Sequence, residues 1–207
     1  MSHARSVVGW TVFLFSVSTG FAATPCEGLA KLSLSNTTVT LAQTVAAGAF
    51  TAPAGGRGGQ QFGDLPAFCR VQATLKPSSD SDIKMELWMP EPTRWNGKLR
   101  GTGNGGLGGG ATVNAGPLAN GVRLGYATAG NNTGHEGDSS YAMTHPEKIK
   151  DFGYRSAHEM TVASKAFIKA YYDKPLQYSV MAEGGGGTIA ALSAAQRYPE
   201  DYDLIAI

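Results

Sequence analysis

The spacing of apolar positions separates a β-rich first part of the chain from a second part in which strands and helices alternate. Residues 24–66 are small and polar with a β-prone stretch at Thr37–Ala42, and Phe68–Lys76 follows as a predicted strand. In Asp82–Pro90 the apolar residues occupy every second position, which is the period of a strand. Its two faces carry Ile83, Met85, Leu87 and Met89 on one side, and Lys84 and Glu86 on the other.

The second part predicts units of strand, helix and strand. Strands are expected at Lys98–Gly103, Val122–Ala129, Gln177–Ala182 and Leu204–Ile207. Helices are expected at Arg155–Tyr172 and Thr188–Arg197. In the first helix, apolar residues three or four positions apart share one face: Met160, Ala163, Phe167 and Ala170. Strands that alternate with helices indicate a largely parallel sheet, so the predicted fold class is α/β with a β-rich N-terminal segment.

The first segment has the pattern of an export signal. Arg5 precedes an apolar run from Val7 to Val17, which is shorter than the roughly 20 residues that cross a bilayer. We therefore predict a signal peptide at residues 1–23 and one domain at 24–207, secreted or periplasmic. An uncleaved N-terminal anchor is the alternative. No later run approaches about 18 consecutive apolar residues, so no membrane association is expected after cleavage.

Export also bears on the two cysteines, Cys26 and Cys69, which both lie in the predicted mature part. In an oxidising compartment an even pair of cysteines favours a disulfide. The chain-entropy model assigns a loop of this size a stabilisation of about 4 kcal/mol. Two isolated cysteines without a nearby histidine make a poor zinc site, so no metal site is predicted.

Composition narrows the function classes and draws attention to the glycines. A chain of 207 residues, 42% hydrophobic and 16% charged, fits one globular domain. A net charge of +1 without a basic tract offers no electrostatic case for nucleic acid. The 28 glycines concentrate at 101–110 and 184–187. Glycine clusters allow positive φ angles and close approach of a ligand to the backbone, so the elements that flank them decide their meaning.

The first glycine cluster also fits a dinucleotide fingerprint. Gly101–Gly106 reads G-x-G-x-x-G after a predicted strand. That fingerprint should open a helix and meet an acidic residue about 20 positions later. Here the glycine run continues to Gly110, and no acidic residue lies between Glu91 and Glu136. Dinucleotide binding is therefore kept only as an alternative function.

Several unusual stretches resemble the tannase and feruloyl esterase family. They are Cys26-Glu27-Gly28-Leu29, Leu65–Val71, Ser81–Lys84, Trp95–Lys98, Gly103–Gly106, Gly125–Thr128, Thr133-Gly134-His135, His145–Lys148, His158–Thr161 and Gln196–Asp203. The resemblance implies a secreted α/β-hydrolase that cleaves small esters of aromatic hydroxy acids with a Ser-Asp-His triad and no cofactor. Members are more than twice as long. The resemblance therefore implies that 24–207 is an incomplete α/β-hydrolase domain that lacks its C-terminal strands and its lid. Calcium is implied only for that missing lid.

The end of the sequence agrees with that expectation. Asp203–Ile207 has the pattern of a buried strand with no cap, turn or polar tail after it. We therefore expect a truncated chain, and a natural terminus is the alternative.

The resemblance places the nucleophile on a sharp strand-to-helix turn with the pattern G-x-S-x-G. Alignment without gaps from Gln196–Pro199 puts this motif on Glu183–Gly187. The nucleophile position is then Gly185, which has no side chain, and the family's neighbouring cysteine falls on Gly184. Thr188 and Ser193 lie beyond the turn, on the predicted helix, where neither hydroxyl is expected to reach the site.

The other triad members are missing as well. In this fold an acid and then a histidine follow the nucleophile. The acidic residues after position 185 are Glu200, Asp201 and Asp203, and no histidine follows. The earlier histidines, His135, His145 and His158, precede the turn, which is the wrong order for the base.

The anion-stabilising groups that the resemblance implies are the amides of Gly105, Gly106 and Gly186. Such donors contribute a few kcal/mol to acyl transfer, but without a nucleophile they have no adduct to stabilise. We therefore expect a carboxylic ester hydrolase by family that is itself inactive. The alternative is a non-catalytic relative that binds aromatic ligands in the vacant cleft. His135 is a candidate substrate contact or a loop hydrogen bond, and His158 is expected to be a packed structural residue.

Overall fold

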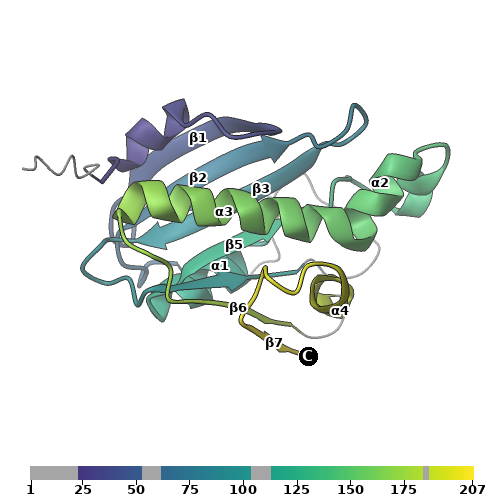
Figure 1. The fold of residues 1–207 in the computed structure, drawn as a ribbon. Helices are drawn as coiled ribbons and strands as arrows, with labels where there is room; N and C mark the ends of the chain where they lie inside the picture. Colours follow the sequence, from purple (N-terminus) through teal and green to yellow (C-terminus); the bar gives the residue numbers. More distant parts are fainter. Residues whose placement is uncertain (1–22, 53–61, 104–112, 184–186) are drawn as a thin grey trace, which may run out of the picture.

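The computed structural model describes residues 23–52, 62–103, 113–183 and 187–207. Within these ranges seven strands form one mixed sheet in the order β1-β2-β3-β5-β4-β6-β7 (Figure 1). The strands are β1 Thr37–Val45, β2 Phe68–Leu75, β3 Ile83–Pro90, β4 Lys98–Gly101, β5 Ala127–Asn131, β6 Tyr178–Ala182 and β7 Leu204–Ala206. Neighbours pair antiparallel from β1 to β5 and parallel from β5 to β7. The predicted β-rich N-terminal segment is therefore the antiparallel half of the same sheet.

Helices cover both faces of the sheet. The α-helices are α1 Ala115–Arg123, α2 Pro146–Lys150, α3 Ser156–Tyr172 and α4 Thr188–Arg197; shorter 3-10 segments are η1 Cys26–Lys31 and η2 Ser139–Ala142, and η3 Asp151–Arg155 is a π-helix. The long helix α3 crosses one face (Figure 1), where Leu87 of β3 belongs to the same buried cluster as Phe167. The next residue, Trp88, points to the opposite face and packs with Leu118 and Val122 of α1. This alternation follows from the pleat of a strand.

Most predicted elements are confirmed, including α4 at its predicted bounds and α3 within one residue of its predicted start. The strand predicted at Val122–Ala129 is wrong in its first part, because Val122 belongs to α1 and β5 begins at Ala127. The side chain of Asn114 caps α1 by accepting a hydrogen bond from the Gly116 amide at 3.1 Å. Gly125, at φ +81°, then turns the chain into β5.

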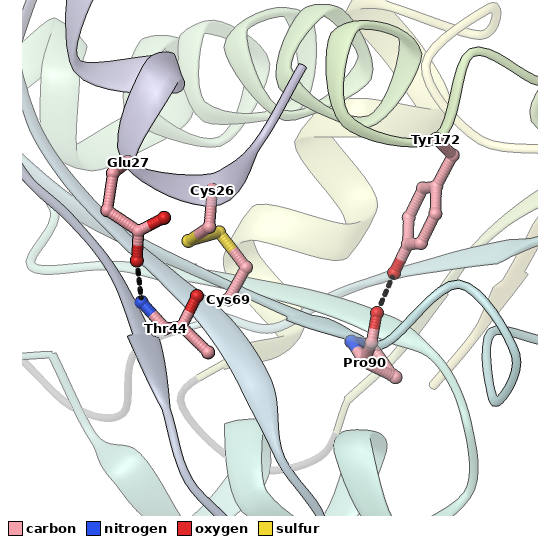
Figure 2. The surroundings of a disulfide bond; sticks show 6 residues. All are labelled: Cys26, Glu27, Thr44, Cys69, Pro90 and Tyr172. Carbon is pink, nitrogen blue, oxygen red and sulfur yellow. Dashed lines mark hydrogen bonds between the residues drawn. A yellow bond between two sulfur atoms is a disulfide. The ribbon is translucent and has the colours of Figure 1, made fainter. Parts of the chain in front are cut away.

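The predicted disulfide between Cys26 and Cys69 is present and buried (Figure 2). It joins η1 to β2 with the two Cα atoms 5.6 Å apart. Beside it, Glu27 Oε1 accepts a hydrogen bond from the Thr44 amide at 2.8 Å. These contacts fasten the N-terminal segment to the edge of the sheet formed by β1 and β2.

Three further findings concern the remaining predictions. In the described ranges, no helix has both the length and the apolar composition that crossing a membrane requires. The same ranges contain no group of three or more His, Cys, Asp or Glu residues placed to hold a metal ion. Residues 1–22 of the predicted signal peptide lie outside the described residues.

Candidate functional site

The carboxyl ends of β5, β4 and β6 lie side by side at one edge of the sheet. In open α/β sheets this edge is where ligands bind. Thr102 and Gly103 follow β4, the loop 132–135 follows β5, and Glu183 follows β6. The chain thus brings together three segments that are far apart in sequence.

The loop after β5 is held by asparagine side chains. Asn132 Oδ1 accepts hydrogen bonds from the amides of Lys84 at 2.9 Å and Gly134 at 3.0 Å. Asn131 Oδ1 accepts one from the amide of Thr133 at 2.7 Å. Thr133 is buried and has φ 61°, which is rare for a β-branched residue and persists only where the surroundings impose it. The loop is therefore a rigid support for the residue that follows it.

That residue is His135, which the sequence offered as a substrate contact or a loop hydrogen bond. Its ring is buried and stacks on Tyr141 with centroids 3.8 Å apart, and Nδ1 lies 3.2 Å from Thr133 Oγ1. The loop hydrogen bond is thus present, and contact with a ligand stays a prediction. Burial raises the pKa of Tyr141, so its hydroxyl stays a neutral hydrogen-bonding group at pH 7.

A cavity of about 310 Å³ opens beside these two rings. It is lined by Asp82, Asn132, Gly134, His135, Glu136, Tyr141, His145 and Lys148. Lys148 Nζ donates to the Gly134 carbonyl at 3.3 Å, and His145 Nδ1 lies 3.1 Å from Asp80. The cavity therefore combines an aromatic wall with polar groups, a lining suited to a small aromatic molecule that carries hydrogen-bonding substituents.

Glycines allow β4 and α4 to approach each other closely. A methyl group built on Gly103 would lie 2.8 Å from the Cα of Gly187, which precedes α4. A methyl group on Gly101 would overlap the hydroxyl of Tyr202. Thr102 fixes the other side, because its amide and its hydroxyl both donate to the Ala129 carbonyl, at 2.8 and 3.0 Å. These contacts require glycine at 101 and 103.

Sequence reasoning passed over Glu183, which brings a carboxylate to this junction. Burial raises the pKa of Glu183, while a hydrogen bond from the Gly103 amide and the charge of Arg100 partly oppose that effect. A methyl group on Gly187 would lie 2.5 Å from Glu183 Oε2. The signal for this residue was present in the sequence, since a glutamate stands at the first glycine of the G-x-S-x-G pattern.

The predicted nucleophile position, Gly185, lies outside the described residues, together with Gly184 and the oxyanion candidates Gly105, Gly106 and Gly186. The flanks of the turn are as predicted, since β6 ends at Ala182 and α4 begins at Thr188. On α4, the Ser193 hydroxyl donates to the Gly153 carbonyl at 2.8 Å. That hydroxyl is therefore engaged with η3 rather than with the edge where the strands end.

The residues considered for the other triad roles serve structural contacts. His158 Nδ1 lies 2.9 Å from Asp201 Oδ2, and its ring stacks on Tyr198 with centroids 3.8 Å apart. Burial raises the pKa of Asp201, against a lowering effect of the hydrogen bond to His158. Asp203 Oδ2 accepts from the amide of Ser179 at 2.7 Å, near the start of β6 and so at the opposite end of that strand from Glu183. These contacts agree with the expectation that His158 is structural.

Comparison with known proteins shows that this chain is similar to a family of esterases. The family model described as tannase and feruloyl esterase matches residues 69–206. The chain is 38% identical over 192 residues to an uncharacterized esterase of Xanthomonas campestris pv. campestris. The match covers 91% of this chain and 32% of that relative. It is 37% identical over 136 residues to feruloyl esterase B of Aspergillus niger, covering 65% of this chain and 25% of that enzyme.

Solved structures agree with this assignment. The crystal structure of feruloyl esterase B from Aspergillus oryzae matches with a TM-score of 0.77 at 32% identity, over 87% of this chain and 36% of that one. Tannin acyl hydrolase from Aspergillus niger, at 18% identity and a TM-score of 0.62, shares the fold over 89% of this chain and 34% of its own. This chain thus spans a quarter to about a third of the length of these relatives. The predicted α/β-hydrolase fold class is confirmed, and the chain belongs to the tannase and feruloyl esterase family.

Proposed function

We propose that this chain binds esters of aromatic hydroxy acids at the carboxyl edge of its sheet without hydrolysing them. The observation that carries the proposal is the sequence between β6 and α4, which is one glutamate followed by four glycines. A nucleophile elbow needs a hydroxyl or thiol at the sharp turn, and this run offers neither. Catalysis of the family's type therefore lacks its attacking atom.

The rest of the triad does not compensate for that loss. No histidine follows Gly185 within these 207 residues, so the order of nucleophile, acid and base cannot be completed by them. Amide donors such as those expected at Gly105, Gly106 and Gly186 stabilise an oxyanion only after a nucleophile has attacked. In triad enzymes that lose a member, anion stabilisation and binding leave only a small residual rate.

Two observations support the binding part of the proposal. The cavity beside His135 and Tyr141 has a volume of about 310 Å³, within the range of small-molecule sites. Relatives at 37–38% identity include proteins named feruloyl esterase or probable feruloyl esterase, which makes esters of aromatic acids the first ligands to try. The disulfide between Cys26 and Cys69 and the predicted signal peptide support a secreted or periplasmic location for this binding.

The test measures turnover and binding on the same preparation of the full chain. Methyl ferulate and methyl gallate are the substrates, a boiled sample is the blank, and feruloyl esterase B from Aspergillus oryzae is the active control. We expect saturable binding of methyl ferulate by titration calorimetry and no turnover above the blank. Heat-labile turnover would contradict the loss of activity, and no binding at millimolar ester would contradict the binding role.

The variant Gly185→Ser separates the missing nucleophile from the missing base. For a protein of these 207 residues we expect it to stay inactive, because no histidine after Gly185 within them can accept the proton of the added hydroxyl. Turnover by Gly185→Ser would mean that another residue supplies a base, and the proposed inactivity would then rest on the glycine alone.

A further inference from the structure

We infer that the cavity beside His135 and Tyr141 binds the free anion of an aromatic hydroxy acid more tightly than its ester, and that Lys148 sets this preference. The inference rests on the proposed function, because it names the form of the ligand that the same cavity prefers. The eight residues named above as lining the cavity all belong to the described part of the chain. The assignment is made on those residues alone.

The main chain after β5 holds the Lys148 ammonium at the cavity. Lys148 belongs to α2, and its Nζ donates to the Gly134 carbonyl at 3.3 Å. Gly134 is itself held, because its amide donates to Asn132 Oδ1 at 3.0 Å. The next residue is His135, whose ring stacks on Tyr141. An aromatic acid whose ring lies along these two side chains can therefore bring its carboxylate to Lys148.

The positive charge of Lys148 is not paired within the part of the chain that the structure describes. An ammonium has three N–H donors, and the Gly134 carbonyl accepts from one of them without neutralising the charge. Lys148 takes part in no salt bridge among the described residues, whereas Lys150 on the same helix pairs with Glu147. The Lys148 side chain is half-buried, so a carboxylate that pairs with it meets less competition from water than at an exposed lysine.

The acidic residues around the cavity leave this charge available. Three of them each contact a basic side chain: Asp82 with Lys84, Asp151 with Arg155 and Asp80 with His145. Glu136 also lines the cavity but is exposed, so water and salt screen its charge. An ester offers Lys148 a neutral carbonyl oxygen, whereas the acid anion offers a carboxylate. Hydrogen bonds between charged groups are roughly twice as strong as those between neutral ones, which favours the anion.

The experiment measures the affinities of ferulate and methyl ferulate at pH 7 by titration calorimetry on the full chain. For the wild type we expect ferulate to bind about tenfold more tightly than the ester, equivalent to about 1.4 kcal/mol. Lys148→Gln should lower the affinity for ferulate about tenfold and leave that for the ester within about twofold. Lys148→Arg keeps the charge and should keep the preference. The matched control is Lys174→Gln, at an exposed lysine after the far end of α3, which should behave as wild type.

Two further measurements test whether charge is the cause. Glu136→Gln removes an opposing charge and should raise the affinity for ferulate about twofold. Its control is Glu91→Gln, at an exposed glutamate just after β3, which should leave the affinity unchanged. Added sodium chloride should weaken the binding of ferulate to the wild type and leave the binding of the ester unchanged, because salt screens the attraction between charges. A purely structural role of Lys148 would not produce this dependence on salt.

The outcomes separate the inference from the proposed function. If the wild type binds both ligands equally, or if Lys148→Gln keeps the preference, the inference is overturned and the binding function stands. Loss of the preference in Lys148→Arg, or binding of ferulate that does not respond to salt, also overturns it. If ferulate binds through Lys148 and the ester does not bind at millimolar concentration, the ester-binding function fails and the cavity is a site for acids. If neither ligand binds, both proposals fail. A cooperative thermal transition for every variant establishes that folded proteins are compared.

Discussion

The antiparallel half of the sheet and the edge where the parallel strands end each hold a glutamate, buried in the first case and half-buried in the second, and the two are stabilised differently. In the antiparallel half, Glu86 accepts two hydrogen bonds from Arg70, at 2.8 and 2.9 Å. It accepts another from Gln72 at 2.7 Å and a fourth from Trp88 at 2.8 Å. With its side chain 5% exposed and its charge matched by Arg70, this carboxylate is a completed part of the core.

Among the described residues, Glu183 at the parallel edge has no such set of side-chain hydrogen-bond donors. Burial raises its pKa, while a hydrogen bond from the Gly103 amide and the charge of Arg100 act in the opposite direction. A buried carboxylate with a full set of donors stabilises one arrangement of its neighbours, whereas one with few donors keeps capacity for an interaction that is not yet made. The two carboxylates therefore differ in how completely their neighbours satisfy them.

The surroundings of Glu86 are also more densely packed than those of Glu183. Around Glu86, Trp88 stacks on Phe68 with centroids 4.5 Å apart, and the disulfide closes the nearby edge. Beside Glu183, α4 buries the small residues Ala191 and Ala194 and leaves Ile189 and Leu192 exposed. Most of the buried apolar contact is therefore in the antiparallel half and under α3, and the edge with the candidate site is the more lightly packed region.

Removing the carboxylate of the completed network should have the largest effect on stability. Glu86→Ala leaves the donors of Arg70, Gln72 and the buried Trp88 without their acceptor, and breaking a buried pair costs about 3–5 kcal/mol. Urea denaturation measures this loss, and Glu91→Gln should change the free energy of unfolding by less than about 0.5 kcal/mol. A loss below about 1 kcal/mol for Glu86→Ala would remove the distinction between the two carboxylates.

The disulfide is the next largest contribution on the antiparallel side. Replacing both Cys26 and Cys69 by alanine should lower the free energy of unfolding by about 2–4 kcal/mol, since the cross-link restricts the unfolded chain. Both residues are changed so that no thiol is left to form other pairs. Reducing agent should destabilise the wild type by a similar amount and leave the double variant unchanged. Equal stability of the two proteins would show that η1 is held by packing alone.

On the parallel edge, the loop that supports His135 should depend on one side chain. Asn132→Ala removes the acceptor of two backbone amides, those of Lys84 and Gly134, and should cost about 2 kcal/mol. Asn120→Ala, at an exposed position of α1, is the control and should change stability by less than about 0.5 kcal/mol. An effect of Asn132→Ala no larger than this control would mean that the strained loop is held by other contacts.

Local spacing predicted most of the fold, and its one clear failure has a physical cause. The period of two in β3 and the three-to-four spacing in α3 are properties of neighbouring residues, and both elements formed as expected. Helix α1 was missed because its sequence contains two glycines and a proline, which are poor helix formers. Its helix is stabilised by the Asn114 cap and by burial of Leu118 and Val122 against Trp88, and such distant contacts leave no local pattern.

The parts of the candidate site that are neighbours in the sequence could be predicted. The contacts between segments that are far apart in the sequence could not. The predicted nucleophile position, Gly185, comes from counting along the sequence, and β6 and α4 end and begin on either side of it as expected. The surroundings of Glu183 depend on Gly103, which lies at the end of another strand and is brought close by the sheet. The sequence shows a glutamate in a glycine run, and only the fold shows that this side chain is half-buried against Gly187.

The smallest expected effect is a gain in stability, on replacing Glu183, where the preceding variants lose stability. Because burial raises the folded-state pKa of Glu183, the fold favours its protonated form. Its contribution to stability is therefore fully present below the unfolded pKa of about 4.3 and is lost as the pH rises through the folded value. At pH 7 the wild type carries the cost of a half-buried charge, which Glu183→Gln avoids. We expect the variant to be more stable at pH 7, by on the order of 1 kcal/mol.

The pH dependence shows whether the charge is the cause. The difference between Glu183→Gln and the wild type should shrink towards zero as the pH falls from 7 to 4, because Glu183 then takes up a proton. Burial raises the pKa of Tyr202, so its hydroxyl stays neutral over this range. Urea denaturation of both proteins between pH 4 and 8 measures the difference. If Glu183→Gln is less stable at every pH, the bond from the Gly103 amide outweighs burial, and Glu183 is then a fixed structural carboxylate like Glu86.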